Sequence, residues 1–226
     1  MESIQKLREI VAGLCDVDPS EVESTFSLNE HGLKSSARRT ALAAAIRRRL
    51  GKDSAEIYNA STFGDLEKVV GSNGAPATSH VQPSTHPQAR VRVSGFPAGV
   101  PEGVGLVCGV DMEPVETMPE TPDYWEHEFY RDTFSDDEIA YCALQENPRM
   151  HFAARWCAKE ALLKAIPGLR GERFCNLEVI RSSSGGVSLG RRVEQSVIKL
   201  PFALSLSHTE SVAIAMVVGL EPRGET

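Results

Sequence analysis

The chain has 226 residues, a length that suits one or two domains with a sizeable hydrophobic core. Its formal net charge of −7 argues against a protein that coats nucleic acid or an anionic membrane. No apolar stretch reaches the ~20 residues of a bilayer span, and the charged segment after Met1 is unlike a secretory leader, so we expect a cytoplasmic protein. Five cysteines without a CxxC pair and six histidines without an HxxxH pair predict neither a disulfide framework nor a transition-metal site.

The first 72 residues predict a small all-α bundle. Apolar residues at helical spacing indicate a first helix over residues 4–14. A second helix is predicted over residues 35–50, with Gly51 at its end, and a third over residues 62–70. The second helix carries five arginines that we expect to point largely outward: Arg38, Arg39, Arg47, Arg48 and Arg49.

Residues 73–103 are predicted to be a linker, because five prolines and many small polar residues cannot bury enough apolar surface to fold. Residues 104–220 are predicted to form an α+β domain, with a small antiparallel sheet packed on one long helix. Residues 221–226 are left as a tail. Within the α+β domain, strands or helices are expected over residues 104–110, 136–144, 150–166, 177–181, 202–206 and 212–218.

Two acids follow the first predicted strand of this domain. Asp111 and Glu113 stand two residues apart, so a strand that continues through Glu113 places both carboxylates on one face. Neighbouring carboxylates repel unless a positive group lies between them, and a hard divalent cation such as Mg²⁺ suits oxygen ligands. An exposed acidic strand end is the alternative that this short pattern leaves open.

The long predicted helix carries a second group of charges. Glu160 and Lys164 are four residues apart and therefore share one helix face, with Arg155 and Lys159 along its flanks. An ordinary solvated ion pair is the alternative interpretation. His208 follows a predicted strand, where a packed or capping histidine is the alternative to a ligand-binding one.

Four segments, taken in order and spacing, resemble the 4′-phosphopantetheinyl transferases, especially the short holo-acyl-carrier-protein synthase branch. They are Gly109–Asp111, Phe134–Ile139, Phe152–Lys164 and Leu204–Thr209. The resemblance implies an enzyme that transfers 4′-phosphopantetheine from coenzyme A to a serine of an acyl carrier protein, for fatty acid or polyketide biosynthesis. Two stretches depart from the family pattern, the turn over residues 167–171 and the short segment 186–201.

The resemblance also assigns roles to single residues. A Mg²⁺ ion is expected at Asp111, Glu113 and Glu160, with Glu160 and Lys164 as the catalytic residues. Coenzyme A is expected to contact Lys159, Lys164, Arg155 and His208.

The N-terminal bundle resembles an acyl carrier protein domain, whose serine carries covalent 4′-phosphopantetheine. The resemblance lies in the segment from Phe26 to Ser36. Counting forward from Gly32 selects Ser35 as the attachment site, whereas counting back along the helix selects Ser36. A serine that only caps the helix is the alternative.

Two hypotheses for the whole chain follow. The first is a transferase with an attached carrier-like domain that it could itself modify, and the second is a carrier or docking module with an inactive transferase half. Short-branch relatives resemble a trimer with active sites between subunits, so we expect a homo-oligomer, with a trimer favoured. We also expect the basic second helix, including Arg38 and Arg39, to dock on the acidic segment between Glu116 and Glu138.

Overall fold

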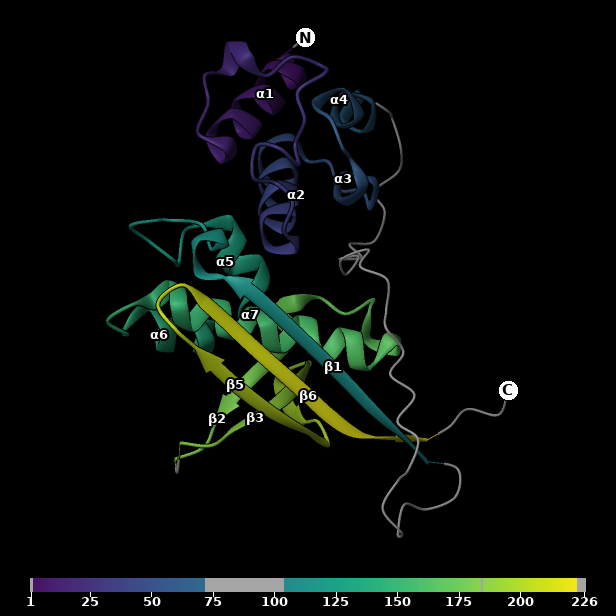
Figure 1. Ribbon diagram of the computed structural model, residues 1–226, viewed down its shortest axis with the longest axis vertical. Helices are drawn as coiled ribbons and strands as arrows, with labels where there is room; N and C mark the ends of the chain where they lie inside the picture. Colours follow the sequence, from purple (N-terminus) through teal and green to yellow (C-terminus); the bar gives the residue numbers. More distant parts are fainter. Residues whose placement is uncertain (1, 72–103, 184, 223–226) are drawn as a thin grey trace.

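A computed structural model describes residues 2–71, 104–183 and 185–222 (Figure 1). The predicted linker and residues 223–226 of the predicted tail lie outside these described residues. The N-terminal helices and the C-terminal α+β part each have a hydrophobic cluster. No helix in the described ranges is long and apolar enough to cross a lipid bilayer.

The N-terminal part is the predicted helical bundle. Its helices are α1 (Glu2–Cys15), α2 (Ser36–Leu50), α3 (Glu56–Asn59) and α4 (Phe63–Gly71), with a 3₁₀ turn, η1 (Pro19–Glu21). Three of the helices match the predicted ranges to within a few residues, and α3 was not expected. The Ser35 hydroxyl caps α2 by accepting from the Arg38 N–H, and Gly51 ends that helix at a φ of 64°, in the left-handed region that glycine tolerates.

The C-terminal part is α+β, as predicted. Its helices are α5 (Glu128–Thr133), α6 (Asp136–Ala143) and α7 (Pro148–Ala165), and its 3₁₀ turns are η2 (Val115–Thr117), η3 (Pro167–Leu169) and η4 (Phe174–Asn176). Its strands are β1 (Val104–Pro114), β2 (Leu177–Arg181), β3 (Val187–Val193), β4 (Ser196–Lys199), β5 (Phe202–His208) and β6 (Val212–Pro222). They form two antiparallel sheets, ordered β1-β6-β5 and β2-β3-β4, where we had predicted one. Helix α5 and strands β3 and β4 were not predicted.

Strand β1 lies against helix α7 and fixes the position of its own two acids (Figure 1). Its residues alternate, so that Asp111 and Glu113 are buried while Val110 and Met112 face outward. The two elements pass so closely at Gly109 that a Cβ atom there would lie 2.0 Å from the Ala161 carbonyl oxygen. This close crossing holds the inward face of β1 on the helix.

Helix α2 joins the two parts, because it packs into both hydrophobic clusters. Leu42 and Ile46 belong to the bundle cluster, whereas Ala37 and Ala41 are buried in the C-terminal cluster. In Figure 1, α2 stands between the remaining N-terminal helices and α5. The helix is therefore buried on two sides. An ordinary amphipathic helix, with one apolar stripe, would be buried on one side only.

The arginines of α2 divide into two groups, and our expectation for Arg38 and Arg39 is wrong. Arg39 is buried and its Nη2 donates to the Asn29 side-chain oxygen at 2.8 Å, while Arg38 reaches the Leu14 carbonyl oxygen at 3.5 Å. Both bonds stay inside the bundle. The contacts with the acidic segment are made by Arg47 and Arg48, near the C-terminal end of the helix.

Candidate active site

Three carboxylates gather where β1 meets α7. Asp111 and Glu113 come from the inward face of β1, and Glu160 comes from α7. All three side chains are buried, with Glu160 only 1% exposed. Each has one oxygen without a hydrogen-bond partner: Asp111 Oδ2, Glu113 Oε1 and Glu160 Oε2. Buried carboxylate oxygens are normally satisfied, so this cluster is chemically incomplete as it stands.

The pKa values of these acids reflect the crowding. Burial, followed by the nearby charge of Asp111, raises the pKa of Glu160 to about 8, although Lys164 acts in the opposite direction. Burial also raises the pKa of Glu113. A site that holds carboxylates at unfavourable pKa values is a candidate for binding a positive ligand or for proton transfer.

Lys164 is the positive group that the structure brings to this cluster. Its Nζ donates to Asp111 Oδ1 at 2.6 Å and to the Val110 carbonyl oxygen at 3.4 Å. The side chain keeps 26% of its surface exposed, so its ammonium lies at the edge of the site. From there it can reach both the carboxylates and a ligand in solvent.

The donor set fits a hard divalent cation. Three unpaired carboxylate oxygens are ligands of the type that Mg²⁺ prefers, and such an ion would relieve their mutual repulsion. The arrangement is not a coordination shell, since no group of three or more His, Cys, Asp or Glu side chains in the described ranges could hold a metal ion as placed. The Lys164 ammonium already pairs with Asp111, so a bound cation would compete with it for this carboxylate.

Lys159, predicted to contact coenzyme A, has a different environment. Its side chain has no exposed surface, and its ammonium donates to the Thr133 carbonyl oxygen at 2.7 Å, to Glu138 Oε2 at 2.6 Å and to the Phe174 carbonyl oxygen at 3.0 Å. Three bonds use all the donors of an ammonium group. Lys159 therefore supports the fold, and we remove it from the set of coenzyme A contacts.

Arg155 and His208 belong to a second cluster of basic side chains, along the N-terminal half of α7. The Arg155 guanidinium lies 4.3 Å from the centre of the Tyr141 ring, which Arg181 also contacts at 4.6 Å. The His208 ring lies 5.0 Å from that of His151. Sequence reasoning missed Tyr141, His151 and Arg181, although the four-residue spacing of His151 and Arg155 on the helix was a usable signal.

One serine of the bundle reaches the carboxylate site. The Ser35 side chain lies beside the Glu113 carboxyl group and, with Thr117, acts to lower the Glu113 pKa against the effect of burial. The same hydroxyl accepts a hydrogen bond from the Arg38 backbone N–H at 3.2 Å, so Ser35 both caps α2 and lies at the site. Ser36, the other candidate, is the first residue of the helix.

Known proteins resemble the C-terminal part of the chain. Residues 107–217 match the 4′-phosphopantetheinyl transferase superfamily. The holo-[acyl-carrier-protein] synthase of Thermodesulfovibrio yellowstonii is 32% identical over 122 residues, which cover 52% of this chain and 96% of that relative. The synthase of the same name from a Geobacter species is 38% identical over 92 residues, covering 38% of this chain and 74% of the relative.

A solved structure is also similar. The ACPS–CoA complex of Chronobacterium ammoniagenes aligns with a TM-score of 0.42 and 25% identity, over 52% of this chain and 98% of that one. The family match lies within the part that holds β1, α7 and the three carboxylates. Because the chain aligns with almost the whole length of a relative at 32% identity, it belongs to the 4′-phosphopantetheinyl transferase superfamily.

Proposed function

We propose that the protein transfers 4′-phosphopantetheine from coenzyme A to a serine of an acyl carrier protein, including the serine of its own N-terminal bundle. The observation that carries the proposal is the contact between the Ser35 hydroxyl and Glu113 of the carboxylate site. Family membership supports the reaction class, and the contact supports the bundle as an acceptor.

The acceptor hydroxyl has to lose a proton as it attacks phosphorus. The attack forms the serine O–P bond and breaks the bond to the second phosphate of the coenzyme A pyrophosphate, which leaves as the nucleotide bisphosphate. Glu113 is the carboxylate in contact with the hydroxyl, so we assign the proton to it, in place of the Glu160 role expected from sequence.

The negative charge of the coenzyme A pyrophosphate has to be balanced by positive groups of the site. Lys164, at the exposed edge of the site, is placed to meet a phosphate oxygen. Asp111, Glu113 and Glu160 would hold Mg²⁺, which supplies Lewis-acid stabilisation of phosphate charge when bound. The exposed Arg181 and His208, with the buried Arg155 behind them, suit the anionic nucleotide end of coenzyme A.

A homo-oligomer, most simply a trimer, is part of the proposal. One face of the β1-β6-β5 sheet is apolar and open to solvent, with Met112 64% exposed and Met216 44% exposed. Its other members include Leu106, Val110, Ile214 and Leu220. A continuous apolar sheet face of this kind is typical of a surface that another subunit covers.

Intact-protein mass spectrometry after incubation with coenzyme A and Mg²⁺ tests the function. The wild-type chain should gain one phosphopantetheine group, and Ser35→Asn should gain none. Asparagine keeps the helix cap, so the loss would reflect the missing nucleophile and not an unwound helix. Ser36→Ala is the matched control and should be modified at the wild-type rate.

Other outcomes separate the alternatives. Modification of an added acyl carrier protein, without any mass gain on the chain itself, would keep the transferase and reject its own bundle as acceptor. No mass gain on the chain or on any added carrier would instead support the carrier or docking module with an inactive transferase half. Modification of Ser36→Ala but not Ser35→Asn would identify the acceptor directly.

A further inference from the structure

The boundary between the bundle and the C-terminal part is held by charge at one end of α2. Arg47 forms an ion pair with Asp132 of α5. Arg48 donates to the Glu126 carbonyl oxygen at 2.9 Å and lies 3.4 Å from Glu128 Oε2. The partners come from a stretch some 80 residues further along the chain, so these contacts are tertiary and not local.

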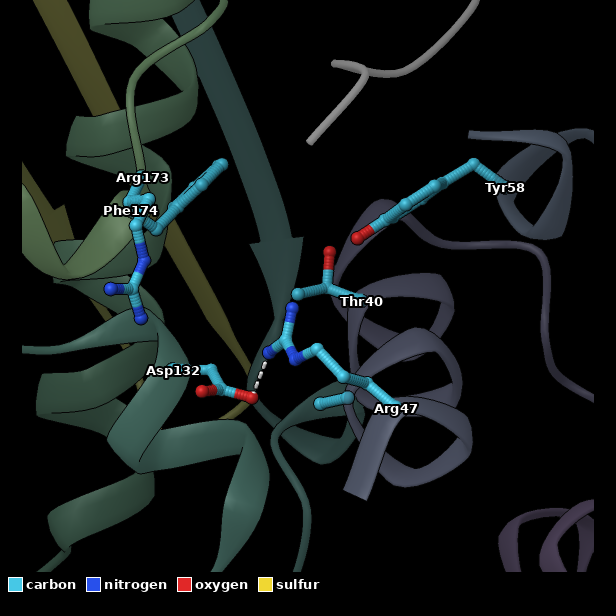
Figure 2. A pocket seen from close by; sticks show the side chains of 7 residues that line it. Thr40, Arg47, Tyr58, Asp132, Arg173 and Phe174 are labelled. Atoms are coloured by element: carbon cyan, nitrogen blue, oxygen red, sulfur yellow. Dashed lines mark hydrogen bonds and ion pairs between the residues drawn. The ribbon is translucent and has the colours of Figure 1, made fainter. Parts of the chain in front are cut away.

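Figure 2 shows this boundary from close by. Arg47 of α2 and Asp132 of α5 point toward one another beside a small cavity of about 20 Å³. Thr40 and Tyr58 line the cavity from the bundle, and Arg173 lines it from the C-terminal part. A cavity of this size holds about one water molecule, so the pairing is close and only partly hydrated.

The apolar part of the same boundary is small. Ala37 and Ala41 of α2 enter the C-terminal cluster with a single methyl group each, and Leu14 of α1 packs partly buried against it. Neither alanine distinguishes one helical partner from another, since small apolar side chains fit many surfaces. Discrimination between partners is therefore left to the charges.

We propose that Glu128 and Asp132, with the Glu126 carbonyl oxygen beside them, form an acidic docking surface that selects carrier domains whose helix after the acceptor serine ends in arginines. The partner that fits is this chain's own bundle, and a carrier whose corresponding helix is acidic is rejected by like-charge repulsion. The inference rests on the proposed function and adds the class of carrier that the site accepts.

The geometry relates docking to the reaction site. Helix α2 runs from Ser35 at the carboxylates to Arg47 and Arg48 at the acidic surface, so one rigid element spans both contacts. Three turns of helix fix the distance between them. Pairing at the C-terminal end of the helix therefore sets where the serine at its N-terminal end lies.

A charge-reversal cycle in the full-length chain tests the inference. Arg47→Glu with Arg48→Glu, or Glu128→Arg with Asp132→Arg, should each slow modification of the chain's own bundle roughly five- to tenfold at low salt, as expected for two partly exposed pairs. Combining all four substitutions should return the rate to within about threefold of wild type. Lys68→Glu is the control, with the same charge change on α4, where Lys68 pairs with Asp65 of the same helix, and an expected change below about twofold.

A gain of function sharpens the test. The Glu128→Arg/Asp132→Arg chain should modify an added carrier protein with an acidic helix at least about fivefold faster than the wild-type chain does. Equal rates in every variant, or a wild-type preference for the acidic carrier over its own bundle, would overturn the selection while leaving the transferase intact. Absence of transfer to any acceptor would be a failure of the proposed function and not of the docking surface alone.

Discussion

Two lysine–carboxylate pairs lie on α7 and its neighbours, and they differ in how completely they are satisfied. Lys159 pairs with Glu138 at 2.6 Å with no exposed surface, and two carbonyl oxygens complete its ammonium. Lys164 pairs with Asp111 at the same distance, yet it is partly exposed and stands among carboxylate oxygens that lack partners. We call Lys159–Glu138, whose polar atoms are all bonded, the closed pair, and Lys164–Asp111 the open pair.

This difference indicates that the Lys159–Glu138 pair supports the fold, whereas the Lys164–Asp111 pair is available to a ligand. Glu138 is itself fully engaged, because its oxygens also accept the N–H groups of Ser135 and Val179 at 3.1 and 3.0 Å. A network in which every donor and acceptor is used stabilises one conformation and offers nothing to a ligand. Unsatisfied oxygens and an exposed ammonium, in contrast, can exchange partners when a substrate arrives.

Removing the closed pair should have the largest effect on stability. Lys159→Met leaves the Glu138 carboxylate buried without its cation, and we expect a loss of about 3–5 kcal/mol in the free energy of unfolding. Urea denaturation of the full-length chain measures it. Lys164→Met is the matched comparison, with a smaller expected loss of about 1–2 kcal/mol, because its ammonium is partly exposed although Asp111 is buried. Equal losses in both variants would show that the pairs do not differ as described.

Removing the open pair should instead affect the reaction. Lys164→Met should lower the rate of phosphopantetheine transfer by about 10²–10³-fold, a typical cost for one preorganised electrostatic group. Single-turnover mass spectrometry at saturating coenzyme A measures the rate. A variant that keeps wild-type turnover with an unchanged melting temperature would remove Lys164 from the site.

The crossing of β1 over α7 brings the open pair together and can be disturbed from a distance. Gly109→Ala places a methyl group against the Ala161 carbonyl oxygen, so strand and helix must separate, at an expected cost of about 1–3 kcal/mol in stability. Asp111, two residues further along, should move from Lys164, and transfer should slow. Gly13→Ala, inside α1 with nothing within 4 Å of the added atom, is the control, which should leave transfer unchanged and should not lower stability.

A further prediction concerns pH. Glu160 has a pKa raised to about 8, so the folded chain binds its proton more tightly than the unfolded chain, where the pKa is near 4.5. This contribution to stability is complete below pH 4.5 and is lost as the pH rises through 8. Melting temperatures measured in a chelator between pH 5 and pH 8 should therefore decline with pH, and Glu160→Gln should decline less; parallel curves would contradict the assignment.

Much of this architecture could be predicted from the sequence. Apolar periodicity located the long helices, and the two-residue spacing of Asp111 and Glu113 predicted correctly that both carboxylates share one face of β1. That this face is buried comes from the fold. Strand β3 escaped prediction because its arginines suggest a solvated loop. In the fold, Arg191 and Arg192 are paired with Glu172 and Glu178, which lie on other elements.

The roles of individual charges could not be predicted in the same way. Lys159 and Lys164 look alike in sequence, and only the folded chain brings Glu138 and two carbonyl oxygens to the first of them. The same holds for the arginines of α2, since Arg39 finds Asn29 inside the bundle and Arg47 finds Asp132 outside it. Such partners lie far apart along the chain, where local patterns carry no information.

The small size of Ala37 and Ala41 affects how long the bundle stays bound to the C-terminal part. Burial of a methyl group contributes about 0.8 kcal/mol, so Ala37 and Ala41 hold the bundle on the C-terminal part only weakly, and the ion pairs beside them are partly exposed. Larger side chains at these positions would bind more tightly and leave more slowly. If the bundle is modified as proposed, this weak apolar contact lets it dissociate from the C-terminal part by thermal motion after the reaction.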